Sequence, residues 1–212
     1  MNPTTGAADG YRASTVAVLA YDGVDDLDFF GAWSVLRKAE AAGASDPAGG
    51  QLLCSILAPG GNFRTSTGLS VAIDALEIDG GFDAVVVPGG AGATSAALDP
   101  TVVRRLRGLR SEGARFYSIC SGSIVIGDCG LLNGRTVAIH ASKREMLRSV
   151  SGVTVVSGLH EDDWLTSIGG SQSSSVKGVA IAFEVVRRYC PAHLAHLRAR
   201  MEIAPEGKHA NA

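Results

Sequence analysis

The chain is 212 residues long, and 46% of its residues are hydrophobic while 19% are charged. This composition predicts one globular domain with a sizeable core and excludes intrinsic disorder for most of the chain. Lysine and arginine number 19 against 21 aspartates and glutamates, so the net charge of −2 provides no electrostatic reason to bind nucleic acid or an anionic membrane. No apolar run approaches the roughly 20 residues that span a bilayer, and residues 1–14 lack the pattern of a secretory signal, so we expect a cytoplasmic protein.

The sequence predicts strands and helices that alternate along the chain. Continuous apolar runs predict buried strands, and apolar residues at helical spacing predict helices. The first half is predicted to contain a disordered lead at 1–13, strands at 14–21, 51–58 and 82–87, helices at 25–43 and 99–112, a loop at 44–50 and an irregular extended pair at 63–73. The second half is predicted to contain strands at 115–119, 135–139, 153–156 and 164–167, helices at 121–132, 142–150, 174–189 and 191–201, and a tail at 206–212.

This alternation predicts one doubly wound α/β domain over residues 14–205, with a mostly parallel sheet. Ligands of such sheets bind beyond the carboxyl ends of the strands, near a topological switch point. The residues that follow each predicted strand are therefore the first candidates for a site. They are Asp22–Asp28, Pro88–Gly92, Cys120–Gly122, His140 and the loop after Trp164.

Cys120 is the strongest candidate by position, because it lies where a predicted strand turns into a helix. A nucleophile at such a corner is held above the sheet in a strained backbone conformation. The helix N-terminus favours the thiolate, and the N–H of Ser121 is expected to point toward an anion beside the sulfur. The alternative is a core cysteine at a tight turn, which the small residues Ser121, Gly122 and Ser123 argue against.

Two further segments are expected near this cysteine. Gly89 and Gly90 end a neighbouring strand, and their N–H groups could complete an oxyanion hole, although an ordinary turn is the simpler reading. Asp28 lies among apolar residues, where burial would raise its pKa toward that of a general acid or base. The alternative for Asp28 is a solvated acid in the first helical turn, while Asp25 is the expected helix cap.

His140 ends a predicted strand and could orient or deprotonate Cys120, since Cys–His pairs are a usual activating arrangement. The four cysteines are scattered and lack zinc-ligand spacing, so we expect free thiols and no metal or other cofactor.

These motifs together resemble the ThiJ/PfpI superfamily over residues 14–205. They are the Asp-Leu-Asp that ends at Asp28, the Val-Pro-Gly-Gly that ends at Gly90, the Ser-Ile-Cys-Ser-Gly-Ser around Cys120 and the Leu-Leu-Asn-Gly-Arg-Thr-Val-Ala-Ile-His that ends at His140. The resemblance implies a flavodoxin-like three-layer sandwich, a cysteine nucleophile and a homodimer with its site near the interface. The acid after the first strand and the Met-Glu-Ile-Ala-Pro stretch at 201–205 resemble the isocyanide hydratase branch.

The resemblance also implies roles for individual residues. Cys120 matches the nucleophile, Asp28 the buried acid that bonds the thiol, and Gly90 and Ser121 the amides beside the sulfur. His140 matches a family histidine without a clear role as a base.

The chain departs from the family pattern in three places. Phe30-Gly31-Ala32 replaces Thr-Gly-Pro, and Ala141 stands where a tryptophan usually follows the histidine. The loop at 168–176, which includes the candidate substrate-binding residues Gly169 and Gly170, looks longer than the family's compact turn and is expected to cap the pocket. The identity of the small-molecule substrate therefore stays open.

The leading hypothesis is a cysteine-dependent hydro-lyase that adds water to a small organic isocyanide. One alternative is a glyoxalase-type activity on 2-oxoaldehydes through the same thiolate. Another is a non-catalytic redox or ligand sensor, because an exposed reactive thiol oxidises readily. A protease is disfavoured because Ser121 stands where the proteases of the superfamily carry a histidine.

Overall fold

A six-stranded sheet runs through the protein in the order β2-β1-β5-β6-β10-β9. The computed structural model describes residues 12–73, 81–170 and 176–203. The strands are β2 (Leu52–Leu57), β1 (Ser14–Leu19), β5 (Ala84–Val87), β6 (Arg115–Ile119), β10 (Leu165–Gly169) and β9 (Gly158–Glu161). All neighbours pair in parallel except β9, which is antiparallel to β10 at one edge. The mostly parallel sheet that the sequence predicts is confirmed.

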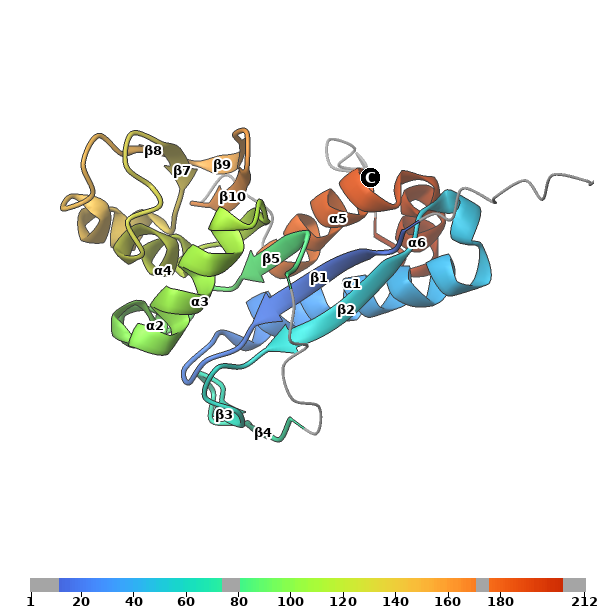
Figure 1. Ribbon diagram of the computed structural model, residues 1–212, viewed down its shortest axis with the longest axis horizontal. Helices are drawn as coiled ribbons and strands as arrows, with labels where there is room; N and C mark the ends of the chain where they lie inside the picture. Colours follow the sequence, from blue (N-terminus) through green and yellow to red (C-terminus); the bar gives the residue numbers. More distant parts are fainter. Residues whose placement is uncertain (1–11, 74–80, 171–175, 204–212) are drawn as a thin grey trace, which may run out of the picture.

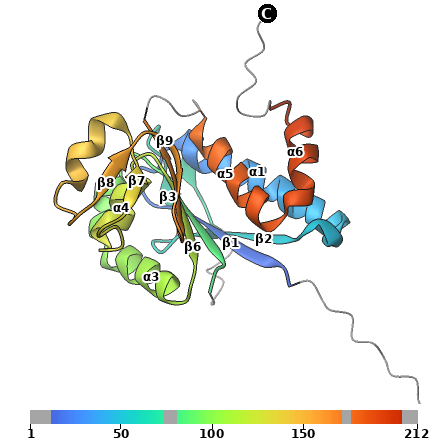
Figure 2. The same ribbon diagram turned by 90° about the horizontal axis from the view of Figure 1, so that it is seen from above.

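Helices cover both faces of this sheet (Figures 1 and 2). One layer contains α1 (Asp26–Ser45), α5 (Lys177–Tyr189) and α6 (Leu194–Arg200), with the short 3-10 turns η1 (Pro47–Gly49) and η3 (Pro191–His193). The opposite layer contains α2 (Ala93–Leu98), α3 (Pro100–Ser111) and α4 (Gly122–Asp128). This arrangement confirms the flavodoxin-like three-layer sandwich.

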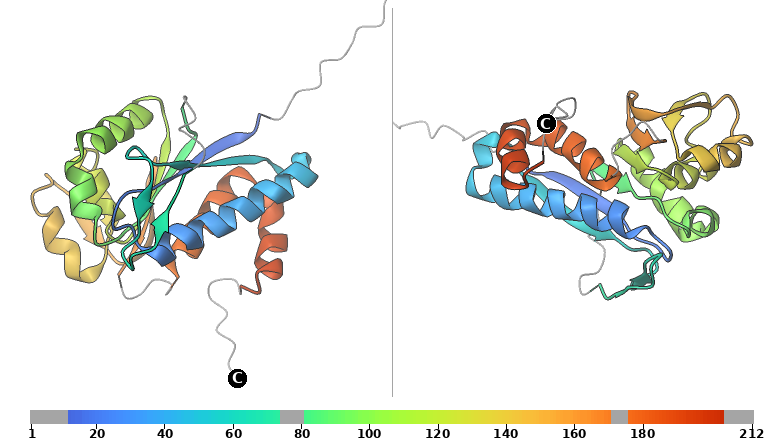
Figure 3. Two further views of the ribbon diagram at one scale, coloured as in Figure 1. Left: turned by 90° about the horizontal axis from the view of Figure 1, so that it is seen from below. Right: turned by 180° about the vertical axis from the view of Figure 1, so that it is seen from behind.

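Two small sheets stand outside the central one, at opposite sides of the molecule (Figures 1 and 3). β3 (Phe63–Arg64) and β4 (Ser70–Val71) form an antiparallel pair, as the extended segment at 63–73 predicted. β7 (Thr136–Ala138) and β8 (Thr154–Val156) pair in parallel, and the 3-10 helix η2 (Ala141–Leu147) lies between them in the chain.

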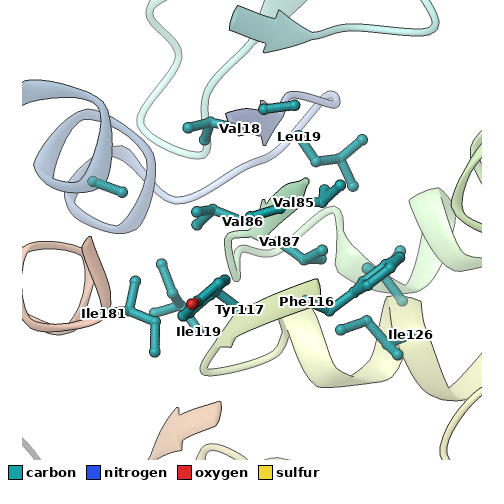
Figure 4. Close-up of a cluster of buried hydrophobic side chains, with 14 of the residues drawn as sticks. Val18, Leu19, Val85, Val86, Val87, Phe116, Tyr117, Ile119, Ile126 and Ile181 are labelled. Carbon is teal, nitrogen blue, oxygen red and sulfur yellow. The ribbon is translucent and has the colours of Figure 1, made fainter. Parts of the chain in front are cut away.

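The core lies on both faces of the central strands, which explains their uninterrupted apolar sequences. β5 and β6 are buried along their whole length. On β6, Phe116 points toward Ile126 of α4, whereas Tyr117 and Ile119 point toward Ile181 of α5 (Figure 4). Successive side chains of a strand alternate between its faces, so one short segment anchors both helical layers.

Two helices begin at the aspartate caps that the sequence predicted. The Asp25 carboxyl accepts hydrogen bonds from the N–H groups of Leu27 and Asp28 at 3.0 and 3.1 Å, and Asp99 accepts one from Thr101 at 2.7 Å. Both caps satisfy N–H groups that the first helical turn leaves free. The expected cap at Asp25 is confirmed.

Other expectations for the elements were wrong in their details. The first helix continues to Ser45 instead of ending at residue 43. The 3-10 helix η2 at Ala141–Leu147 stands where an α-helix was predicted at 142–150. α2 and β9 were missed, because α2 is a helix of only five small residues and one leucine, too short for a clear helical periodicity, and β9 is a half-exposed edge strand of four residues.

Parts of the predicted lead, loop and tail cannot be compared with the structure. Residues 1–11, 171–175 and 206–212 lie outside the described residues. Within the described ranges, no helix has both the length and the apolar character needed to cross a bilayer.

The crossing of α5 over α1 depends on Gly178, where an added Cβ would lie 2.5 Å from the carbonyl oxygens of both Leu27 and Asp28. We expect Gly178→Ala to lower the free energy of unfolding by about 1–3 kcal/mol, because two backbones must separate to admit the methyl group. Gly108→Ala is the matched control, since Gly108 also lies in a helix and an added Cβ there would meet open space among the described residues. Alanine at this position should raise stability by up to about 1 kcal/mol. Chemical denaturation measures both, and equal effects would contradict the packing argument.

Candidate active site

Three chain segments meet at the carboxyl ends of β1, β5 and β6. β1 pairs with β2 on one side and with β5 on the other, so the direction of winding changes between β1 and β5. Beyond this switch point lie the N-terminus of α1, the Pro88–Gly90 turn and Cys120. This is where open α/β sheets place their ligands.

Cys120 occupies a sharp corner between β6 and α4. Its backbone has a φ of 54°, and among the described residues Glu202 is the other non-glycine residue with a positive φ. Such a conformation costs on the order of 1–3 kcal/mol and persists only when the surroundings impose it. Here the Cys120 N–H donates to the Ile168 carbonyl at 2.8 Å, which ties the corner to β10. The side chain is partly buried, so the sulfur is not sealed in the core.

Asp28 faces this corner from the first turn of α1. It is only 8% exposed, and its Oδ2 accepts a hydrogen bond from the Gly89 N–H at 3.0 Å. A Cβ added to Gly89 would lie 2.8 Å from Asp28 Oδ2 and 3.0 Å from Cys120 Cβ. The carboxyl and the cysteine therefore flank the same point on the Gly89 backbone, and a larger residue at position 89 would push them apart.

The pKa of Asp28 is raised to about 7. Burial is the main cause, and the nearby charge of Asp25 adds to it. The hydrogen bond from Gly89 and the charge of Lys177 act in the opposite direction. A carboxyl group with this pKa can both release and accept a proton near neutral pH.

The pKa of the Cys120 thiol is raised, which corrects the expectation of a thiol acidified by a helix N-terminus. Burial is the largest cause, and the charge of Asp28 is the next. The Ser121 N–H, Lys143 and Lys177 lower the pKa but do not outweigh them. Because the ionised Asp28 contributes to the rise, a proton on Asp28 favours the thiolate, and the two groups titrate as a coupled pair.

The glycine amides expected beside the sulfur are already engaged. The Gly89 N–H donates to Asp28, and the Gly90 N–H donates to Ser121 Oγ at 2.9 Å. The Ser121 hydroxyl donates in turn to the Gly90 carbonyl at 3.1 Å, so it binds the turn to the corner. The Ser121 N–H is the backbone donor that acts on the sulfur.

Three other candidates, His140, Gly169 and Gly170, have structural contacts of their own. His140 is exposed and caps η2, where its Nδ1 accepts from the Ser142 N–H at 3.2 Å. Gly169 is the last residue of β10, and an added Cβ there would lie 2.5 Å from the Ile139 carbonyl carbon. Gly170 likewise lies against Ser157. These contacts place the three residues against η2, Ile139 and Ser157. Gly169 also follows Ile168, whose carbonyl accepts from the Cys120 N–H, so it lies near the Cys120 backbone. A role for the three residues in binding substrate stays a prediction.

Sequence reasoning missed three residues of the site. Tyr21 lies two residues after the end of β1, and its hydroxyl donates to the Pro88 carbonyl at 2.7 Å. Its pKa is raised well above the ordinary value by burial, then by Asp28 and Cys120, so the phenol stays neutral beside them. The rule that selects residues after strands could have found Tyr21. Lys143 and Lys177 come from η2 and α5, and no sequence signal links them to the thiol.

The described residues contain no group of three or more histidines, cysteines or acids positioned to hold a metal ion. All four cysteines are free thiols. Burial raises the pKa of Cys54 to about 12 and those of Cys129 and Cys190 to about 11, so these three thiols are protonated at neutral pH. Cys120 and Asp28 together offer the chemistry of a thiol coupled to a carboxyl group.

Comparisons with known proteins identify the family of this chain. The model of the DJ-1/PfpI family matches residues 14–183. A Streptomyces lividans protein described as an uncharacterized protein in the cpoL 5′ region is 31% identical over 126 residues, which cover 59% of this chain and 86% of that protein. An isonitrile hydratase from Pseudomonas putida is 28% identical over 104 residues, which cover 49% of this chain and 46% of the hydratase.

Solved structures share the same fold. Drosophila melanogaster DJ-1beta has a TM-score of 0.76 at 18% identity, with 92% of this chain and 100% of that chain covered. A ThiJ/PfpI family protein from Pseudomonas syringae has a TM-score of 0.75 at 18% identity, with 99% of this chain and 87% of that chain covered. At these identities the likeness extends to the fold alone.

The raised pKa of Asp28 makes stability depend on pH. The folded protein holds this proton up to about pH 7, whereas an unfolded aspartate with the ordinary pKa of 3.8 releases it earlier. The stabilisation is complete below about pH 4 and is lost as pH rises through about 7. We therefore expect Asp28→Asn to be more stable than the wild type at pH 8, by up to about 4 kcal/mol, with a difference that shrinks toward pH 4. Denaturation across this range measures it, and a constant difference would contradict the shift.

Proposed function

This chain belongs to the DJ-1/PfpI family, and from that premise we propose that it is a cysteine-dependent hydratase. It adds water to a small organic isocyanide and releases an N-substituted formamide. The observation that carries the proposal is the strained corner at Cys120 with the buried carboxyl of Asp28 beside it. The partial match to an isonitrile hydratase supports the choice of substrate class.

In the first step, the sulfur and a proton both add to the terminal carbon of the isocyanide. The Cys120 thiolate attacks this electrophilic carbon and forms a C–S bond, while protonated Asp28 delivers its proton to the same carbon. The product is a thioimidate on Cys120, and Asp28 is left as a carboxylate. The pKa of about 7 suits this transfer, because the acid is neutral when the thiolate attacks and is still able to release its proton.

The second step removes the product with water. Asp28 takes a proton from water as its oxygen attacks the thioimidate carbon, and the same proton then passes to the nitrogen. When the C–S bond breaks, the hydroxyl proton returns to Asp28 and the thiolate of Cys120 is regenerated. Each cycle consumes one isocyanide and one water, and covalent catalysis divides one difficult addition into two easier ones.

A glyoxalase-type reaction on a 2-oxoaldehyde is the second candidate, because the same thiolate would add to an aldehyde carbon as a hemithioacetal. The structural likeness to DJ-1 proteins extends to the fold and does not favour one reaction. Offering the purified protein an isocyanide and methylglyoxal in parallel separates the two readings. Formamide production supports the proposal, whereas lactate production alone contradicts it.

The proposal includes two expectations about the protein's setting. A free catalytic thiol persists in the reducing cytoplasm, in keeping with the four unpaired cysteines. The homodimer implied by the family resemblance stays a prediction.

We expect Cys120→Ala to reduce formamide production to the uncatalysed level, because the variant lacks the sulfur that forms the covalent intermediate. Asp28→Asn should reduce kcat by about 10²–10⁴-fold, since it removes the proton that both steps transfer. Cys54→Ala is the matched control, because this thiol lies in β2 with a pKa of about 12 and should leave turnover unchanged. Product formation by NMR measures all three. Full turnover by Cys120→Ala in a folded protein would exclude the nucleophile.

The pH dependence of turnover follows from the coupled pair. Below about pH 7 the site holds both protons, so the thiolate needed for attack is absent. Loss of the first proton creates the form with one proton shared between Asp28 and Cys120, and loss of the second removes the acid. We therefore expect kcat/KM to rise with an apparent pKa near 7 and to fall again at higher pH. A rate independent of pH between 5 and 9 would contradict this assignment.

A further inference from the structure

Lys143 brings a fixed positive charge to the site from η2. Its Nζ donates a hydrogen bond to the Gly90 carbonyl at 3.2 Å, and the same oxygen accepts from Ser121 Oγ. The ammonium group is thus held next to the residue that follows Cys120. Its charge acts on the sulfur, since it lowers the pKa of the thiol.

Lys177 brings a second positive charge from the first residue of α5. Its neighbour Gly178 packs against the backbone of Asp28, which places the start of α5 beside the buried carboxyl. Lys177 is half-buried as a residue, and within the described part of the chain its ammonium group has no hydrogen bond or ion pair. The helix dipole disfavours a cation at this end, so the stability of α5 does not explain a lysine there.

The two lysines approach the thiol from opposite sides of the sheet. η2 packs on α4, whereas α5 packs on α1 (Figure 2). The acids near them are largely engaged: Asp25 caps α1, and the Asp26 carboxyl accepts from Thr67 Oγ1 at 2.8 Å. Neither acid forms an ion pair with a lysine among the described residues.

The charges of the Cys120–Asp28 pair and of the two lysines can be compared directly. With a thiolate on Cys120 and a proton on Asp28, the reactive pair carries one negative charge against two ammonium groups. The Asp25 carboxylate, whose charge also acts on Asp28, is compensated by the N–H groups and the positive dipole end of the helix that it caps. One further negative charge would therefore match the two lysines. We propose that the Cys120 site takes a substrate that carries an anionic group, such as a carboxylate, held between Lys143 and Lys177. This inference rests on the proposed function in taking Cys120 as the reacting thiol.

Alkylation of Cys120 tests the inference without any turnover. Iodoacetate and iodoacetamide attack the same thiolate and differ mainly in charge, so the ratio of their rates cancels any change in the pKa of the thiol. Peptide mass spectrometry follows the reaction at Cys120 separately from that at Cys54, Cys129 and Cys190. N-acetylcysteine provides the ratio for a thiol without neighbouring charges.

We expect iodoacetate to be favoured at Cys120 relative to N-acetylcysteine. Lys143→Met and Lys177→Met should each lower the ratio by about threefold, and the double variant by about tenfold, as expected for partly solvated charges that act on the same group. Lys143→Arg and Lys177→Arg should retain most of the preference. Lys38→Met is the matched control, because this lysine bonds Ser34 on α1 and should leave the ratio unchanged. Salt should weaken the preference of the wild type but not that of the double variant.

Turnover of two matched isocyanides, one with a carboxylate and one with its methyl ester, separates this inference from the proposed function. A ratio that falls in the lysine variants supports the anion site even if neither isocyanide reacts, in which case the hydratase proposal fails alone. A ratio that is unchanged in folded Lys143→Met, Lys177→Met and the double variant overturns the anion site. That result leaves the hydratase proposal standing if the ester is hydrated.

Discussion

The site depends on how the start of α1 encloses the peptide of Gly89. The Gly89 N–H donates to the Asp28 carboxyl at 3.0 Å, and the Gly89 carbonyl accepts from the Asp25 N–H at 2.8 Å. These two bonds hold the start of α1, which follows β1, against the turn that ends the neighbouring strand β5. The absence of a side chain at Gly89 lets Asp28 and Cys120 approach the same point, so the chemistry of the pair depends on a backbone contact.

The same contact creates an opposition between stability and reactivity. Burial of Asp28 raises its pKa to about 7, which suits proton transfer. The same burial destabilises the folded state at pH values where the carboxyl is ionised. Cys120 adds a strained backbone with a φ of 54°. The extensive apolar core on both faces of β5 and β6 supports both unfavourable features. Active sites commonly contain strain and displaced pKa values for this reason.

Local sequence predicted much of the fold, because the relevant signals act over short distances. The apolar runs at β1, β5 and β6 identified strands buried on both faces, and the caps at Asp25 and Asp99 identified helix starts. α2 and β9 were missed because their form depends on what they pack against: α2 lies on α4, and β9 pairs with β10. The sequence also placed Asp28, Gly89 and Cys120 near one another, because all three follow strands whose ends share one edge of the sheet.

By itself, the sequence determined the layered α/β fold and the residues after each strand that could form a site, since hydrophobic periodicity and strand ends are local properties. Tertiary structure decided the electrostatics. The pKa of Cys120 is raised instead of lowered, because burial and Asp28 outweigh the nearby N–H of Ser121. Lys143 and Lys177 act on the same thiol from elements distant in the chain, and His140 caps its own helix. Burial and charge at a site are sums over neighbours in space, which local patterns of sequence do not specify.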